Sequence, residues 1–134
     1  MAGNFGYELD LYQISDDEKQ MVREQIALMK KYYGLIHEGT YYRLAAPKEE
    51  EYMAWEFVDQ EQSHALLTVV MTDAQGNPVP VHTKVRGLSP EKYYRCSLNG
   101  QVHSGMTWNH AGLTLNCILE EYESIMIEFS ETAQ

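Results

Sequence analysis

The period of the apolar residues changes near Gly39, and this change constrains the fold more than any other feature of the chain. Between residues 16 and 37 apolar residues recur every three or four positions, the period of an α-helix with one broad apolar face. From Thr40 onward they alternate at every second position, the period of half-buried β-strands. The sequence therefore predicts two unlike parts, residues 1–38 and residues 39–134.

The helical block begins at a recognisable cap. Ser15 is followed three residues later by Glu18, which is a capping box, and Asp16 and Asp17 suit the positive end of the helix dipole. We expect a helix over residues 16–37, with Gly39 as the residue that ends it. Its apolar face combines two adjacent stripes, Val22, Ile26, Met29, Tyr33 and Ile36 in one and Met21, Leu28, Tyr32 and Leu35 in the other. Before the helix, alternation over residues 4–10 predicts one short strand.

The second block predicts an all-β domain. Its candidate strands cover residues 40–45, 52–59, 63–72, 80–87, 92–98, 101–104 and 124–130. Between two of them, Asn99-Gly100 is the strongest short-range signal for a hairpin. Short strands at regular spacing are typical of a sandwich. The predicted fold class is mainly β, an antiparallel β-sandwich preceded by one strand and one long amphipathic helix.

Charge and composition exclude several classes of partner. The 134 residues carry a net charge of −10, which disfavours nucleic acid and anionic membrane surfaces. No apolar run reaches 18 residues, so we expect no transmembrane helix, and the first ten residues do not resemble a signal peptide. Cys96 and Cys117 fit free thiols in a reducing compartment better than a disulfide framework, so we expect a cytoplasmic location.

The sequence offers no set of metal-binding, cofactor-binding or catalytic residues. No pair of histidines has a ligand spacing such as HxxxH, and no phosphate-binding glycine loop occurs. Retaining glycosidases need two carboxylates roughly 5 Å apart, whereas the acidic runs 49–51 and 120–121 read as solvated loops. We therefore predict no catalytic residue, no cofactor and no metal. The histidines in question are His37, His64, His82, His103 and His110.

The aromatic residues of the β block leave two readings open. Aromatic rings can form a platform on which sugars stack, or they can be ordinary residues of a half-buried sheet. Adjacent pairs such as Tyr93-Tyr94 favour the second reading, because they place one ring on each face. The set comprises Tyr41, Tyr42, Tyr52, Trp55, Tyr93, Tyr94 and Trp108.

Residues 3–11, Gly-Asn-Phe-Gly-Tyr-Glu-Leu-Asp-Leu, resemble the last barrel strand of family 36 glycoside hydrolases, the α-galactosidases of the raffinose-utilising type. Residues 15–18 and the following helix resemble the last barrel helix, and residues 39–44 resemble the entry to the accessory domain. The resemblance covers nearly the whole chain, and residues 107–110 depart from it by being longer and more polar. Further matching positions are Tyr32-Tyr33, Leu35-Ile36, Trp55, Arg86-Gly87-Leu88, Tyr93-Tyr94-Arg95, Ser104-Gly105 and Ala111-Gly112-Leu113.

The resemblance implies that the two parts of the chain belong to different domains of a larger enzyme. Residues 1–38 would be the terminal β/α unit of a truncated (β/α)8 barrel, and residues 39–134 a C-terminal sandwich. The aspartate nucleophile and acid/base of the family lie upstream, so the chain alone is expected to be an inactive fragment of a retaining α-galactosidase acting on terminal α-galactosides of the melibiose and raffinose type.

Its partner would be the rest of the barrel. Without that partner, the apolar face of residues 16–37 favours self-association. An independent carbohydrate-binding module and an unrelated small enzyme that uses an acidic pair remain as alternatives.

Overall fold

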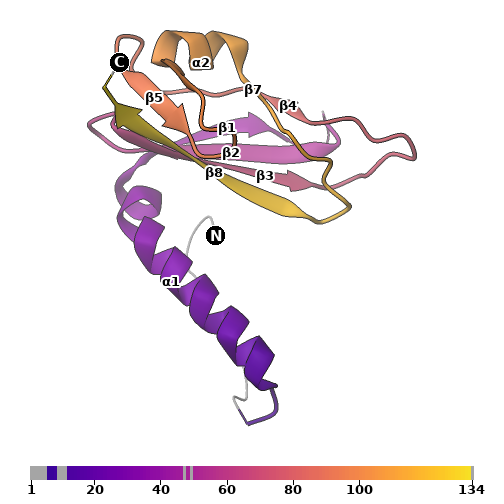
Figure 1. The fold of residues 1–134 in the computed structure, drawn as a ribbon. Helices are drawn as coiled ribbons and strands as arrows, with labels where there is room; N and C mark the ends of the chain where they lie inside the picture. The colour runs from indigo at the N-terminus through magenta and orange to yellow at the C-terminus, as the bar shows by residue number, and fades with distance from the viewer. Residues whose placement is uncertain (1–5, 9–11, 47, 49, 134) are drawn as a thin grey trace. The chain divides into compact units, whose positions relative to one another are not determined.

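The structure of the chain is a computed structural model that describes residues 6–8, 12–46, 48 and 50–133. The chain divides into two compact units, Met1–Glu38 and Gly39–Gln134, which are described separately (Figure 1). Within the described residues, no helix combines the length and the apolar character that crossing a membrane requires.

The first unit contains one helix, α1 (Asp16–Glu38). The predicted capping box is confirmed: Glu18 N–H donates to Ser15 Oγ (3.2 Å), and Ser15 N–H donates to Glu18 Oε2 (2.7 Å). The bond from Ser15 N–H, together with one that the Ser15 hydroxyl donates to Glu18 Oε2 (2.8 Å), holds the pKa of Glu18 below its ordinary value. Residues 6–8 form no strand, and the rest of the strand predicted over residues 4–10 lies outside the described residues.

The burial of α1 differs from the predicted stripes. The buried positions are Met29, Tyr32 and Ile36. Ile26 and Tyr33, which belong to the same predicted stripe as Met29 and Ile36, are exposed. The buried face thus combines Met29 and Ile36 of the first predicted stripe with Tyr32 of the adjacent one.

The second unit is an antiparallel sheet covered on one face by a thinner layer, which confirms the predicted fold class (Figure 1). Five antiparallel pairs join strands that alternation predicted to within two residues at each end, and Asn99-Gly100 lies in the predicted hairpin turn. The six strands, in their order across the sheet, are β1 (Thr40–Ala45), β2 (Tyr52–Val58), β3 (His64–Met71), β8 (Ser124–Thr132), β5 (Tyr93–Cys96) and β6 (Val102–Ser104).

The covering layer contains most of the differences from the sequence predictions. The strand predicted over residues 80–87 is reduced to β4 (His82–Thr83), which pairs with a short strand that alternation missed, β7 (Leu113–Thr114). Residues 107–110 lie in a short helix, α2 (Gly105–Ala111), that was also missed. The Ser104 hydroxyl caps α2 by accepting from Thr107 N–H at 3.2 Å.

The core lies between the sheet and this covering layer. Trp108 anchors α2: its indole N–H donates to the Tyr94 carbonyl at 3.1 Å, and its ring meets Phe129 edge to face at 5.2 Å. The covering layer contributes Val81, Val85, Leu88, Trp108, Leu113, Leu115 and Leu119 to the core, and the sheet contributes residues of β1, β2, β3, β5 and β8.

Candidate functional site

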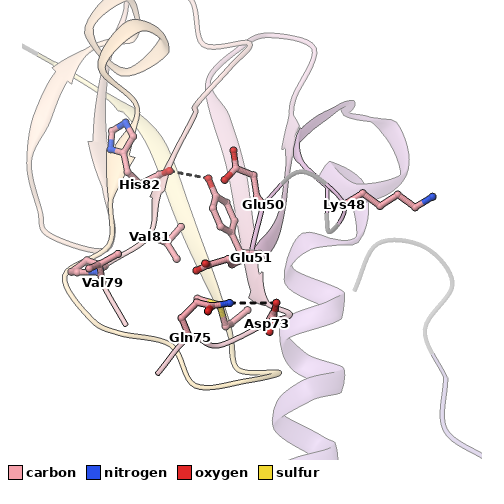
Figure 2. A pocket seen from close by; sticks show the side chains of 11 residues that line it. Lys48, Glu50, Glu51, Asp73, Gln75, Val79, Val81 and His82 are labelled. Carbon is pink, nitrogen blue, oxygen red and sulfur yellow. Dashed lines mark hydrogen bonds between the residues drawn. The ribbon is translucent and has the colours of Figure 1, made fainter. Parts of the chain in front are cut away.

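An open groove of about 630 Å³ lies where β2 begins and β3 ends, against residues 79–82 (Figure 2). Its polar lining includes the carboxylates of Glu50, Glu51 and Asp73, together with Tyr52 and His82. Lys48 also belongs to the lining, but its side chain points away from the others (Figure 2).

The backbone around the groove is held by hydrogen bonds across β2 and β3. The carbonyl of Glu51 accepts from the N–H groups of Thr72 (2.9 Å) and Asp73 (3.0 Å). Tyr52 donates its hydroxyl to the His82 carbonyl at 2.8 Å, which joins β2 to β4 across the groove (Figure 2). Burial raises the pKa of Tyr52, a hydrogen bond with Thr83 lowers it, and the charge of Glu50 raises it further.

The groove does not provide the chemistry of a glycosidase. A general acid needs a carboxyl in an apolar, water-poor site where it can keep its proton, whereas Glu50, Glu51 and Asp73 are all exposed. In the part of the chain that the structure describes, no three His, Cys, Asp or Glu side chains gather as a metal site. The groove is therefore a solvated surface feature with mixed polar groups.

The second acidic run forms a turn. Glu120 and Glu121 are exposed between the covering layer and β8, and the carboxylate of Glu123 accepts from Glu120 N–H at 2.8 Å. This bond stabilises the turn before β8. The two acidic runs lie at different points of the unit, in a groove and in a turn.

The histidines have separate local roles. His37 stacks on Tyr33 with ring centroids 4.0 Å apart, and His82 Nδ1 lies 2.9 Å from Thr114 Oγ1, which joins β4 to β7. His64 lies beside Glu128 on neighbouring strands, with 4.0 Å between Nε2 and Oε1. His103 meets the Trp108 ring edge to face at 5.1 Å, and His110 is in the last turn of α2.

The aromatic residues do not share one exposed surface. Tyr94 and Trp108 are buried in the core, and Tyr42 and Tyr52 pack against it. Tyr41 is exposed on the opposite face of the sheet, because it is adjacent to Tyr42 on β1. This distribution agrees with the reading of these rings as sheet and core residues. The two cysteines are free, Cys96 buried and Cys117 exposed, and burial raises the pKa of the Cys96 thiol.

Sequence reasoning missed Glu56, the buried carboxyl group of the β2 strand. Its side chain is 0% exposed, and its Oε2 accepts from Arg86 N–H at 2.8 Å. Burial raises the pKa of Glu56 to about 8, against a smaller lowering by that N–H group. Alternation did not identify Glu56, because both faces of β2 carry apolar residues and the pattern does not show which face lies on the core.

A model of one protein family matches most of the second unit. It is described as the glycosyl hydrolase family 36 C-terminal domain, and it matches residues 52–129. Among curated relatives, the bifunctional α-galactosidase/sucrose kinase AgaSK of Mediterraneibacter gnavus is 47% identical over 131 residues, which are 98% of this chain and 14% of that protein. The α-galactosidase AgaA of Geobacillus stearothermophilus is 35% identical over 126 residues, 94% of this chain and 17% of that protein.

Solved structures give the same correspondence. The galactosidase domain of AgaSK superimposes with a TM-score of 0.87 at 45% identity, over 96% of this chain and 18% of that one. The family 36 α-galactosidase AgaB of Geobacillus stearothermophilus gives a TM-score of 0.89 at 34% identity, over 98% of this chain and 18% of that one. The chain thus spans less than a fifth of the length of these curated relatives and solved structures.

Proposed function

Because this chain belongs to glycosyl hydrolase family 36 through the C-terminal domain of that family, we propose that residues 39–134 are a non-catalytic accessory domain of an α-galactosidase. The parent enzyme would hydrolyse terminal α-galactosides of the melibiose and raffinose type with retention of configuration. The accessory domain would act by stabilising the catalytic part to which it is attached.

The partner in this proposal is a (β/α)8 barrel, and residues 1–38 are its terminal β/α unit. Two solved α-galactosidase structures match 96% and 98% of the chain, so the likeness extends through α1 and is not confined to the sandwich. An apolar helix face of this kind is what the outer helices of a barrel turn toward the barrel strands. The remainder of the barrel would supply that cover.

The observation that carries the proposal is the distribution of the carboxyl groups. The carboxylates of the groove are exposed, and the buried carboxyl group of Glu56 accepts a hydrogen bond from the backbone N–H of Arg86 in the core. Double-displacement hydrolysis needs two carboxyl groups that flank one substrate bond in a shared cleft. The described residues therefore support a structural role for this domain and a catalytic centre elsewhere in the parent.

A chromogenic α-galactoside tests the catalytic part of the proposal. The chain should give no turnover above a buffer blank, while circular dichroism verifies that the same sample is folded. Turnover that disappears in Glu50→Gln or Glu120→Gln would refute the proposal and favour a small enzyme with its own acidic pair.

Deletion from a relative tests the accessory role. Removing the matching region from AgaSK, to which this chain is 47% identical, should lower the yield of folded galactosidase and its melting temperature. Grafting this chain in its place should restore both. A deletion variant with unchanged activity and melting temperature would contradict the stabilising role.

Sugar binding by the isolated chain separates this proposal from that of an independent binding module. Calorimetric titration with galactose, melibiose and raffinose should give no saturable heat. A dissociation constant below about 1 mM, roughly −4 kcal/mol, would favour the binding module instead.

A further inference from the structure

Residues 85–89, here called the strap, join β4 to the turn before β5 and pack on the core without entering either sheet. Val85 and Leu88 are buried at its two ends. Because the strap lacks a partner strand, side chains from other segments satisfy its backbone polar groups. These bonds are Glu56 Oε2 to Arg86 N–H (2.8 Å), Gln62 Nε2 to the Gly87 carbonyl (2.7 Å), Asn109 Nδ2 to the Leu88 carbonyl (2.7 Å) and Tyr94 Oη to Ser89 N–H (2.9 Å).

Within this set, Glu56 is the ionisable residue whose surroundings are least favourable for a charged side chain. It lies on the core face of β2 between Ala54 and Val58, directly across from Leu67 of β3. Its Oε2 accepts a hydrogen bond from Arg86 N–H of the strap, whereas the buried Oε1 has no hydrogen-bond partner among the described residues. A carboxylate in such a place would lose its hydration without receiving compensating bonds.

The groups that face Glu56 provide no positive charge. From β1, Tyr42 lies in register with it, and from β3 Leu67 does so. The strap contributes the backbone N–H of Arg86, while the guanidinium-bearing side chain of Arg86 is exposed. A proton on Oε1 removes the charge and leaves Oε2 free to accept from the strap.

We propose that Glu56 is carried in the core as a neutral carboxylic acid and acts as a pH-sensitive latch on the strap. When Glu56 loses its proton, the carboxylate favours a state in which residues 85–89 have lifted from the core and water reaches the side chain. Val85 and Leu88 oppose this opening, because lifting the strap exposes both. The latch is therefore tightest at acidic pH and weakens as the pH rises through neutrality toward about 8.

The direction of the pH dependence follows from the two states. Burial raises the pKa of Glu56 in the closed state to about 8, from the 4.5 of an ordinary glutamate side chain. Below the lower value both states are protonated, and the closed state has its full advantage. Between the two values only the open state has lost the proton, so the opening constant rises by about tenfold per pH unit. Above about 8 both states are ionised, and the accumulated change in the opening constant is on the order of a thousandfold.

Amide hydrogen exchange on the 134-residue chain tests the latch. The protection factor of the Arg86 amide should fall by about tenfold per pH unit between about pH 5 and pH 8, after correction for intrinsic exchange. The control amide is Ser97, which donates to the Glu128 carbonyl at 2.9 Å within the sheet; its protection should change much less. Equal losses at Arg86 and Ser97 would indicate global unfolding and overturn the latch.

The matched variant is Glu56→Gln, which keeps the shape and a carbonyl oxygen for Arg86 N–H but cannot ionise in this range. In this variant the protection of Arg86 should be independent of pH. Carbon NMR of the Glu56 carboxyl provides a second readout that does not depend on the variant's fold, with a titration midpoint expected near 8. A midpoint between about 4 and 5, or the same pH slope for Arg86 in both proteins, would overturn the proposal.

Discussion

Replacing Gly112 with alanine should destabilise the second unit more than a glycine substitution in an ordinary turn. Gly112 follows α2 with φ 70° and ψ −162°, a backbone region that essentially only glycine adopts. An added Cβ would lie 2.5 Å from the Thr83 carbonyl oxygen and 3.1 Å from His82 Nε2. Because Gly112 directly precedes β7, which pairs with β4 at His82–Thr114 and Thr83–Leu113, relieving this overlap should push the two strands apart.

The loss of stability expected for Gly112→Ala has two contributions. The backbone conformation should cost an alanine about 1–3 kcal/mol. Moving β7 away from β4 displaces Leu113, which is buried in the core, and forced shifts in a packed core cost about 1–3 kcal/mol. We therefore expect Gly112→Ala to lower the free energy of unfolding by about 2–6 kcal/mol in total.

Two other glycines separate these contributions. Gly100 has φ 72° with nothing within 4 Å of an added Cβ, so Gly100→Ala carries the backbone strain alone. At Gly105 an added Cβ would overlap the Ser89 carbonyl while φ is unexceptional, so Gly105→Ala carries the steric overlap alone. Urea unfolding followed by circular dichroism gives all three values. If Gly112→Ala is no worse than Gly100→Ala, the close approach of Thr83 is not limiting and the reasoning fails.

Three further predictions address other parts of the chain. Ser104→Ala removes the cap of α2 and should cost about 0.5–2 kcal/mol, measured by urea unfolding, with Ser124→Ala as a control at an exposed strand position. The pKa of Asp59 is held below its ordinary value, because hydrogen bonds from Ser63 and from the His64 N–H outweigh the effect of burial. Asp59→Asn should therefore lower the free energy of unfolding at neutral pH, and the two proteins should become equally stable as acid protonates Asp59. A difference in stability that does not change with pH would contradict this. Sedimentation equilibrium should show self-association of the chain through residues 16–37 that Ile26→Glu weakens; a monomeric unmutated chain would refute the role of this face.

Periodicity predicted the large sheet because its strands make backbone ladders with each other. Alternate residues of β3 and β8 face the core, and the apolar pattern follows that alternation directly. It failed for α2, whose Gly105, Thr107 and Asn109 are weak helix formers. Contacts of Trp108 with Tyr94 and Phe129 stabilise that helix, and such contacts between distant segments leave no local pattern.

The strand predicted over residues 80–87 failed for a related reason. Val81, Thr83 and Val85 do face inward, as alternation requires. Beyond Thr83, however, the backbone bonds go to side chains such as those of Glu56 and Gln62 instead of to a neighbouring strand. A sequence pattern reports which way side chains face and gives no information about which groups satisfy the backbone.

The positions that carry the family resemblance also bear on function. Gly105 and Gly112 are sites where a Cβ would overlap another backbone carbonyl, and a Cβ at Gly87 would lie 2.5 Å from the Tyr42 ring. Tyr94 accepts from Ser89 N–H and donates to the Gln62 carbonyl at 2.6 Å, which ties the strap to the turn between β2 and β3. These residues are required by the packing of the covering layer, and none of them presents a reactive group to solvent. The resemblance in this region is therefore one of structure, which agrees with a domain that supports a catalytic centre located elsewhere.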